Sequence, residues 1–365
     1  MLNRRCPYIP AWKVKRELIR IGQRAKARVM EPVWALRQAR YDQRRHLSAQ
    51  ICDGARPLGR DIAIFVIYQP LGLSPSVFVT LDALQRSGYS PFLVLNAPVS
   101  PAEHAQLLQV SALVMTRENF GYDFGGYRDA VLHIERSGID FDDLVFLNDS
   151  VWFPIRADCT HLDAMRNTDG ELVGYTYAVD KPDRRNAHVQ SYLFGFSNLD
   201  RVKRAAFFAY WRNLKVATDR EFTIRKCEMR MTEHFRSAGF RVGWLFSAKD
   251  IITYLERASE SDLARLVEYN VAVGHRRARE QSAALSRSKE TLRQMLLTEA
   301  ASGVMGRNVI GAAPGMAFEA IGLAAIKKSP AFNYMTQKRL LLETCDLHKI
   351  NPTILREIRA QGDAL

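Results

Sequence analysis

The segment from Asp61 to Tyr68 is a short, continuously apolar run rich in β-branched residues, and it constrains the fold more than any other feature of the chain. Such a run predicts a strand buried on both faces of a parallel sheet. Similar runs follow at residues 92–95, 112–115 and 144–147, and the segments between them have helical spacing. This alternation predicts an α/β fold with helices on both faces of the sheet and ligands beyond the carboxyl ends of its strands.

The order of elements changes in the second half of the chain. Residues 173–177 and 192–196 are predicted strands, and residues 201–213 and 224–238 are predicted helices, so we expect a mixed sheet at this end. We divide the chain into a basic helical amino-terminal segment, an α/β nucleotide-binding domain and a mainly helical carboxyl-terminal region, at residues 1–58, 59–255 and 256–365.

Positive charge is concentrated near the amino terminus. Residues 1–46 carry thirteen Lys and Arg against three acidic residues, which is +10 of the chain's net charge of +13. Interleaved apolar residues such as Trp12 and Trp34 suit an anionic membrane surface, where each cation adds about 1 kcal/mol. A nucleic acid and a solvated helix packed on the domain are the alternatives. Because the sequence has no recognised base-reading motif, we expect no specific nucleic acid.

Cysteine spacing and hydropathy indicate the compartment. The five cysteines lack CxxC spacing, so neither a thiolate metal cage nor a disulfide framework is suggested. No early apolar run resembles a signal peptide, and no uninterrupted apolar stretch would span a bilayer. We therefore expect a cytoplasmic protein with peripheral contact at the inner membrane face.

The densest polar motif runs from Glu118 to Asp129, directly after the third predicted strand and at the start of a helix. Its glycines let the backbone approach a ligand, and the helix start offers free N–H groups to a phosphate. Asp123 is placed to bind a ribose or a base. The motif matches neither GxGxxG nor a Walker A loop, and the alternative is that Gly121, Gly125 and Gly126 only permit a tight turn.

A second polar motif, Asn148-Asp149-Ser150, ends the fourth predicted strand. A carboxylate at this place is suited to hold a divalent cation against a diphosphate leaving group. The alternative is an Asx-type turn, in which Asn148 and Asp149 bond nearby backbone. Both motifs fall at the ends of neighbouring predicted strands, so we expect one ligand to contact both.

Taken together, ENFGYDFGGYRDA (Glu118 to Ala130) and LNDSVWFP (Leu147 to Pro154) resemble the rhamnan synthesis protein F family of glycosyltransferases. The likeness includes the stretch from His188 to Phe194 and the surroundings of Glu228. It implies a GT-A-like, Rossmann-type mixed sheet with helices on both faces, in which an acidic DxD-like element binds metal and nucleotide. Asn148-Asp149-Ser150 lacks the second acid, which leaves Asp149 as the clear candidate ligand for Mg²⁺ or Mn²⁺.

The resemblance also implies roles for single residues. The residues implied to contact the nucleotide are Tyr68, which would stack on the base, and Asn119, Gly121, Asp123 and Asn148. Asp149 would face the metal and the diphosphate, and Glu228 is the candidate general base for the acceptor hydroxyl. The alternative for Glu228 is a surface glutamate near Arg225. His188, Gln190 and Tyr192 would line the acceptor or donor-sugar pocket.

These observations lead to one main hypothesis and two alternatives. The main hypothesis is an inverting, metal-assisted glycosyltransferase that carries a sugar such as rhamnose from a nucleotide-sugar donor to a polysaccharide or lipid-linked glycan. The first alternative is a non-catalytic nucleotide- or glycan-binding module, which the missing second acid favours. The second is a nucleic-acid-binding protein driven by the basic segment.

Overall fold

A computed structural model describes residues 11–178, 187–274, 291–305 and 307–362. Its centre is a nine-stranded sheet in the order β1-β4-β3-β2-β5-β9-β7-β10, with β8 paired to β7. The strands are β1 (Gln50–Asp53), β2 (Asp61–Ile67), β3 (Ser90–Leu95), β4 (Leu113–Thr116), β5 (Asp143–Asn148), β7 (Leu172–Ala178), β8 (His188–Val189), β9 (Leu193–Ser197) and β10 (Val242–Ser247). Strands β4, β3, β2 and β5 are parallel, whereas β1 and β9 run antiparallel to their neighbours. The sheet is therefore mixed, as predicted.

Strand β2 shows why the central run is apolar throughout. Ile62, Ile64 and Val66 lie in one buried cluster, and Ala63, Phe65 and Ile67 lie in another. Because alternate side chains of a strand point to opposite faces, both faces of the sheet at β2 are covered.

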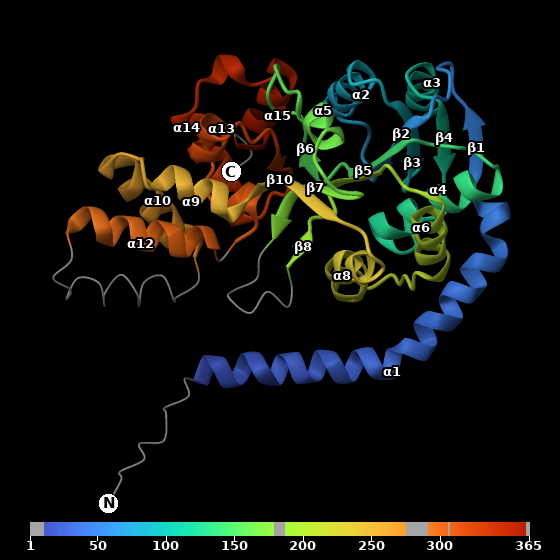
Figure 1. Ribbon diagram of the computed structural model, residues 1–365, viewed down its shortest axis with the longest axis horizontal. Coiled ribbons are helices and arrows are strands. Elements are labelled where there is room, and N and C mark those ends of the chain that lie inside the picture. The colour runs from blue at the N-terminus through green and yellow to red at the C-terminus, as the bar shows by residue number, and fades with distance from the viewer. Residues whose placement is uncertain (1–10, 179–186, 275–290, 306, 363–365) are drawn as a thin grey trace, which may run out of the picture.

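Helices cover the two faces separately (Figure 1). The helices of one face are α4 (Tyr122–Arg136), α6 (Arg201–Asn213) and α8 (Met229–Ser237), which follows α7 (Arg220–Phe222) and the π-helix η1 (Thr223–Glu228). Those of the other face are α2 (Ser76–Arg86), α3 (Pro101–Gln109) and α5 (His161–Arg166). Helix α3 begins with the predicted capping box of Ser100 and Glu103. The predicted α/β architecture, a mixed sheet with helices on both faces, is confirmed.

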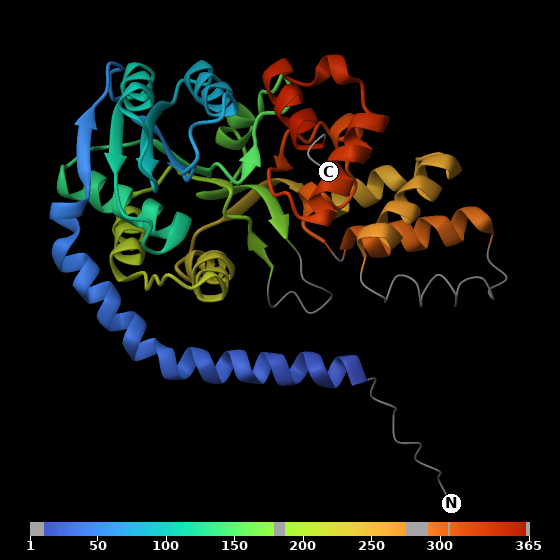
Figure 2. The same ribbon diagram turned by 180° about the vertical axis from the view of Figure 1, so that it is seen from behind.

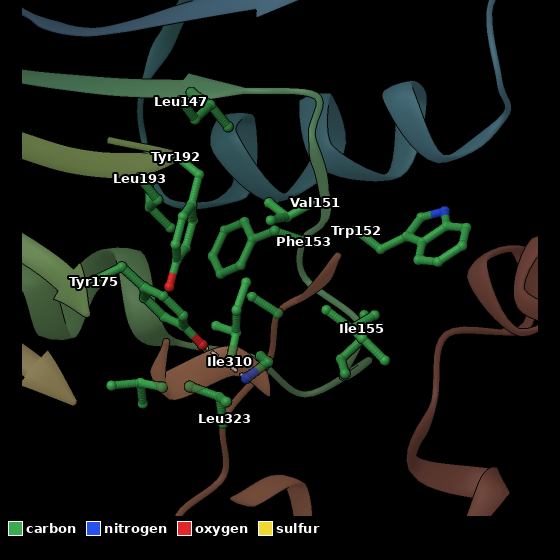
Figure 3. Packing of buried hydrophobic residues seen from close by; sticks show 14 of the residues in the cluster. Leu147, Val151, Trp152, Phe153, Ile155, Tyr175, Tyr192, Leu193, Ile310 and Leu323 are labelled. Carbon is green, nitrogen blue, oxygen red and sulfur yellow. Dashed lines mark hydrogen bonds between the residues drawn. The ribbon is translucent and has the colours of Figure 1, made fainter. Parts of the chain in front are cut away.

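The carboxyl-terminal region packs on the same face as α2. It follows α9 (Ala248–Leu255), and its described helices are α10 (Glu260–Val273), α12 (Leu292–Met305), η2 (Val309–Gly311), α13 (Met316–Ala320), α14 (Phe332–Thr344), η3 (Leu347–Lys349) and α15 (Pro352–Gly362). Figure 3 shows Ile310 and Leu323 beside Tyr175 in the buried cluster. The Ala324 N–H donates to the Tyr175 hydroxyl at 2.7 Å, so this region shares the core of the sheet.

One short strand of this region was not anticipated. Strand β11 (Ile326–Lys327) pairs antiparallel with β6 (Val151–Trp152), which directly follows the Asn148-Asp149-Ser150 motif. A segment about 180 residues later in the sequence is therefore fixed against that motif.

Helix α1 (Ala11–Ser48) is long and leaves the body of the molecule toward its amino terminus (Figure 2). Its second half is anchored, because Trp34 packs on Phe222 and Tyr41 stacks on Phe120, with ring centroids 4.8 and 4.7 Å apart. Strand β1 follows the helix and pairs with β4, so the predicted amino-terminal segment contributes an edge strand to the sheet. Within the residues that the structure describes, no helix is long and apolar enough to cross a membrane.

Candidate functional site

The strand order reverses between β2 and β5. Strands β3 and β4 lie on one side of β2, and β5 lies on the other. In open α/β sheets such a switch point opens a crevice at the carboxyl ends of the strands. Here the two ends are joined, because the Asp149 carboxylate accepts from the Tyr68 N–H at 3.0 Å and the Asp149 N–H donates to the Val66 carbonyl at 3.1 Å.

The two polar motifs meet at this place. The Asn148 side-chain amide donates to the Asp123 carboxylate at 2.9 Å, and Asp123 lies in the first turn of α4. The sequence predicted that the two motifs end neighbouring strands, and this was wrong, because β3 and β2 lie between β4 and β5. Helix α4, which packs on β2 and β3, brings Asp123 to Asn148 instead.

The start of α4 has a special backbone. Gly121 has φ 78° and Tyr122 has φ 53°, a region that side chains rarely adopt. A Cβ on Gly121 would lie 2.8 Å from the Val216 side chain, and one on Gly126 would lie 2.9 Å from Val66. The glycines thus serve a tight turn and close helix–strand packing, and nucleotide contact by Gly121 stays a prediction. Strain of the kind seen at Tyr122 is concentrated at functional sites in proteins.

The surroundings of Asp123 and Asp149 raise the pKa of both carboxyl groups. Burial, together with the nearby Asp149 and Glu228 carboxylates, raises the pKa of Asp123 to about 7, although Lys327 opposes the shift. Burial also raises the pKa of Asp149, against the influence of Lys328 and the Tyr68 N–H. Carboxyl groups with such shifted pKa values are concentrated at functional sites.

Glu228, the predicted base, ends the π-helix η1 and faces the same site. Its carboxylate accepts from the Ser191 N–H at 3.3 Å. Its charge adds to the effect of burial in raising the pKa of Asp123 and opposes the effect of burial in lowering the pKa of Lys327. Arg225 pairs with Glu221 at 3.4 Å. The side chain of Glu228 is therefore directed to the polar cluster, and its role as base stays a prediction.

His188, Gln190 and Tyr192 are buried, and protein groups already bond their polar atoms. The Gln190 side-chain amide donates to the His188 ring at 2.8 Å, and Gln190 also bonds Asn308. The Tyr192 hydroxyl bonds Thr176. A sugar contacting these groups would have to exchange such bonds, so their predicted role in the acceptor or donor-sugar pocket is untested.

The remaining predicted nucleotide contacts are Tyr68 and Asn119. Tyr68 is 49% exposed at the end of β2, as a side chain that stacks on a base must be. The Asn119 side-chain oxygen is buried and has no hydrogen-bond partner among the described residues. A buried acceptor of this kind is costly unless a ligand or water supplies a donor.

Two residues of the site were missed by sequence reasoning. Lys327 of β11 lies opposite Val151, its ammonium donates to the Ser150 hydroxyl at 2.9 Å, and it lies over the Tyr192 ring. The Lys328 N–H donates to the Ser150 carbonyl at 3.1 Å. Burial lowers the pKa of both lysines, against the influence of Glu228 and Asp123 on Lys327 and of Asp149 and Glu357 on Lys328. The local sequence offers no signal for them, because only tertiary pairing brings them here.

The predicted divalent metal fits these residues poorly. Across the described ranges, no three His, Cys, Asp or Glu side chains form a group that could hold a metal ion. Mg²⁺ needs only one or two carboxylates when substrate phosphates complete its shell. However, Lys327 and Lys328 already supply positive charge beside Asp123 and Asp149, and an ammonium would repel a cation placed between them.

Known proteins match this chain over the residues that hold both motifs. A family model described as Rhamnan synthesis protein F matches residues 92–273. The chain is 30% identical over 348 residues to the uncharacterized protein y4gN of Sinorhizobium fredii (strain NBRC 101917 / NGR234), spanning 95% of this chain and 91% of that protein. It is 30% identical over 172 residues to the virulence protein VirA of Vibrio anguillarum (strain ATCC 68554 / 775), spanning 44% of this chain and 51% of that protein.

Two solved structures resemble parts of the chain. One is a candidate nucleotide-diphospho-sugar transferase from Desulfovibrio desulfuricans G20, with a TM-score of 0.33 and 13% identity over 52% of this chain and 81% of that chain. The other is a nucleoside-diphosphate-sugar pyrophosphorylase from Vibrio cholerae RC9, with a TM-score of 0.31 and 12% identity over 50% of this chain and 91% of that chain. At these TM-scores neither structure bears on the function of this chain.

Proposed function

Because the chain belongs to the rhamnan synthesis protein F family, we propose that it is a glycosyltransferase acting in the synthesis of a cell-surface polysaccharide. It takes a sugar, with rhamnose as one candidate, from a nucleotide-sugar donor and passes it to a glycan or lipid-linked acceptor. The observation that carries the proposal is the contact between Asn148 and Asp123, which unites the two polar motifs at the switch point of the sheet.

The donor lies across the carboxyl ends of β2 and β5 in this proposal. The exposed Tyr68 stacks on the base, and the unpaired oxygen of Asn119 accepts from a donor group of the nucleotide. Asp123, whose pKa is raised to about 7, donates to or accepts from the ribose hydroxyls depending on its proton. The diphosphate then lies at the Asn148-Asp149-Ser150 turn.

Transfer proceeds with inversion at C1 of the donor sugar. Glu228 removes the proton of the acceptor hydroxyl as its oxygen attacks C1, the new C–O bond forms, and the bond from C1 to the diphosphate oxygen breaks with its electron pair leaving on the nucleoside diphosphate. The bond from the Ser191 N–H orients the Glu228 carboxylate before attack.

A turnover assay tests this proposal. The protein is incubated with nucleotide sugars and a lipid-linked acceptor, and release of nucleoside diphosphate is followed for wild type and Asp149→Asn. The Asn variant keeps an oxygen that can accept from the Tyr68 N–H but removes the charge, so its fold should survive while transfer falls at least about 100-fold. Turnover at the wild-type rate in this variant would contradict the proposed role of Asp149 at the diphosphate. Nucleotide binding without donor hydrolysis or transfer would favour a non-catalytic binding module.

We further propose that the first part of α1 contacts an anionic membrane, where lipid-linked acceptors are found. Residues 1–28 carry nine Lys and Arg and one Glu. Trp34 and Tyr41 are buried against the domain, so a truncation that tests this contact must end before them.

Deletion of residues 1–28 should therefore abolish binding to anionic vesicles and change the melting temperature by less than about 2 °C. Cosedimentation with vesicles of phosphatidylglycerol measures the first effect, and neutral vesicles are the control. Unchanged cosedimentation of the truncated protein would refute the contact.

A further inference from the structure

Building on the proposed function, we infer that Lys327 binds the diphosphate of the donor and supplies the positive charge at the leaving group that the predicted metal ion would otherwise provide. The inference assigns a binding role to the carboxyl-terminal region, which lies outside the matched residues 92–273.

The backbone places Lys327 with little freedom. It stands in register with Val151 in the β6–β11 ladder, and Lys328 continues the pairing through its N–H bond to the Ser150 carbonyl. Because Ser150 is the last residue of the Asn148-Asp149-Ser150 turn, the lysine backbone is fixed to the turn that the diphosphate is proposed to meet. A group held on paired strands is better positioned than one on a free loop.

The Lys327 ammonium has capacity for a ligand. It donates one hydrogen bond among the described residues, to the Ser150 hydroxyl at 2.9 Å, and an ammonium carries three donors. The Tyr192 ring lies 5.2 Å from it and contributes a cation–π contact on one side. Two donors therefore remain for phosphate oxygens.

Charged groups of both signs surround Lys327. Lys327 as a residue is half-buried, and its ammonium lies near the Asp123 and Glu228 carboxylates, with Arg220 as a further cation nearby. When the diphosphate leaves C1, negative charge develops on its bridging oxygen, and a preorganised ammonium stabilises that charge. Lys328 points elsewhere, to the Ser76 hydroxyl at 3.0 Å, and we assign it the positioning of Asp149.

Calorimetry of nucleoside diphosphates with the full chain tests the inference, in EDTA and again with Mg²⁺ or Mn²⁺. Wild type should bind one nucleoside diphosphate in EDTA, and Lys327→Met should weaken that binding roughly 10- to 100-fold, the range for losing a charge-assisted bond. Lys327→Arg should recover most of the affinity. Lys349→Met, which removes only a surface pair with Glu319, should leave it unchanged.

The outcomes separate this inference from the proposed function. If wild type binds no nucleotide under any condition, the proposed function fails and the inference falls with it. If wild type binds and Lys327→Met binds equally well, or if binding vanishes in EDTA and Mg²⁺ restores it alike in both proteins, the inference alone is wrong. Thermal melts of each variant show that it is folded, and recovery by Lys327→Arg would identify charge as the cause of any loss in Lys327→Met.

Discussion

Carboxylates at the two ends of the sheet are held in opposite ways. At the amino ends of β7 and β10, Glu171 accepts from the Lys203 ammonium at 2.8 Å and from the Arg241 backbone N–H at 2.7 Å. These bonds and the Arg241 guanidinium outweigh the effect of burial and lower the pKa of Glu171 to about 2. At the carboxyl ends of β2 and β5, burial and neighbouring acids raise the pKa of Asp123 to about 7.

The difference separates a structural acid, Glu171, from an acid that we propose to be functional, Asp123. Glu171 has a full set of donors and stabilises the fold, whereas Asp123 sits among other carboxylates and costs stability when charged. Folds retain such costly groups where a ligand needs them.

The largest effect should come from Glu228→Gln. Loss of the base should reduce turnover by about 100- to 10,000-fold, with the melting temperature nearly unchanged, because the amide keeps an oxygen for the Ser191 N–H. The matched control is Glu233→Gln, an exposed glutamate on α8 that pairs with Arg230. If both variants transfer at the wild-type rate, Glu228 is not the base.

A smaller effect, on stability alone, is expected for Glu171→Gln. The charged bonds to Lys203 and Arg241 would be weakened, and urea unfolding at pH 7 should show a loss of about 1–3 kcal/mol. Since the folded-state pKa lies below the ordinary value, the stability that Glu171 contributes is present above about pH 4.5 and is lost as the pH falls toward 2. The difference in the free energy of unfolding between variant and wild type should therefore become smaller as the pH falls. A difference independent of pH would contradict the assignment.

The smallest effect, with the opposite sign, is expected for Asp123→Asn. The folded-state pKa of about 7 lies above the unfolded value, so ionised Asp123 destabilises the fold above pH 7, and this penalty fades as the pH falls toward 4. The variant should melt a few degrees above wild type at pH 8 and near it at pH 4. A lower melting temperature at pH 8 would show that Asp123 is a structural acid like Glu171.

Local sequence patterns predicted the fold better than the site. The apolar run of β2 and the capping box of α3 are short-range signals, and both elements lie where they were predicted. Strand alternation predicted that both motifs lie at the carboxyl edge of the sheet, where one ligand would meet them. The direct bond between Asn148 and Asp123 was not predicted, since β3 and β2 separate the strands that precede the motifs. The division at residues 58 and 255 stays a prediction.

Long-range pairing explains what was missed. Strands β1 and β11 are short and pair with partners distant in sequence, so no periodicity marks them. Lys327 follows an apolar stretch and carries no motif of its own. Its place beside Ser150 results from the β6–β11 ladder, which only the folded chain reveals.

A thermal-shift panel of nucleoside diphosphates and nucleotide sugars tests the central claim, that the carboxyl ends of β2 and β5 bind a nucleotide-sugar donor. We predict that one nucleotide and its sugar raise the melting temperature of wild type and of Glu233→Gln, and that the shift is lost in Asp149→Asn. No shift across the panel, or an equal shift in Asp149→Asn, would contradict the claim.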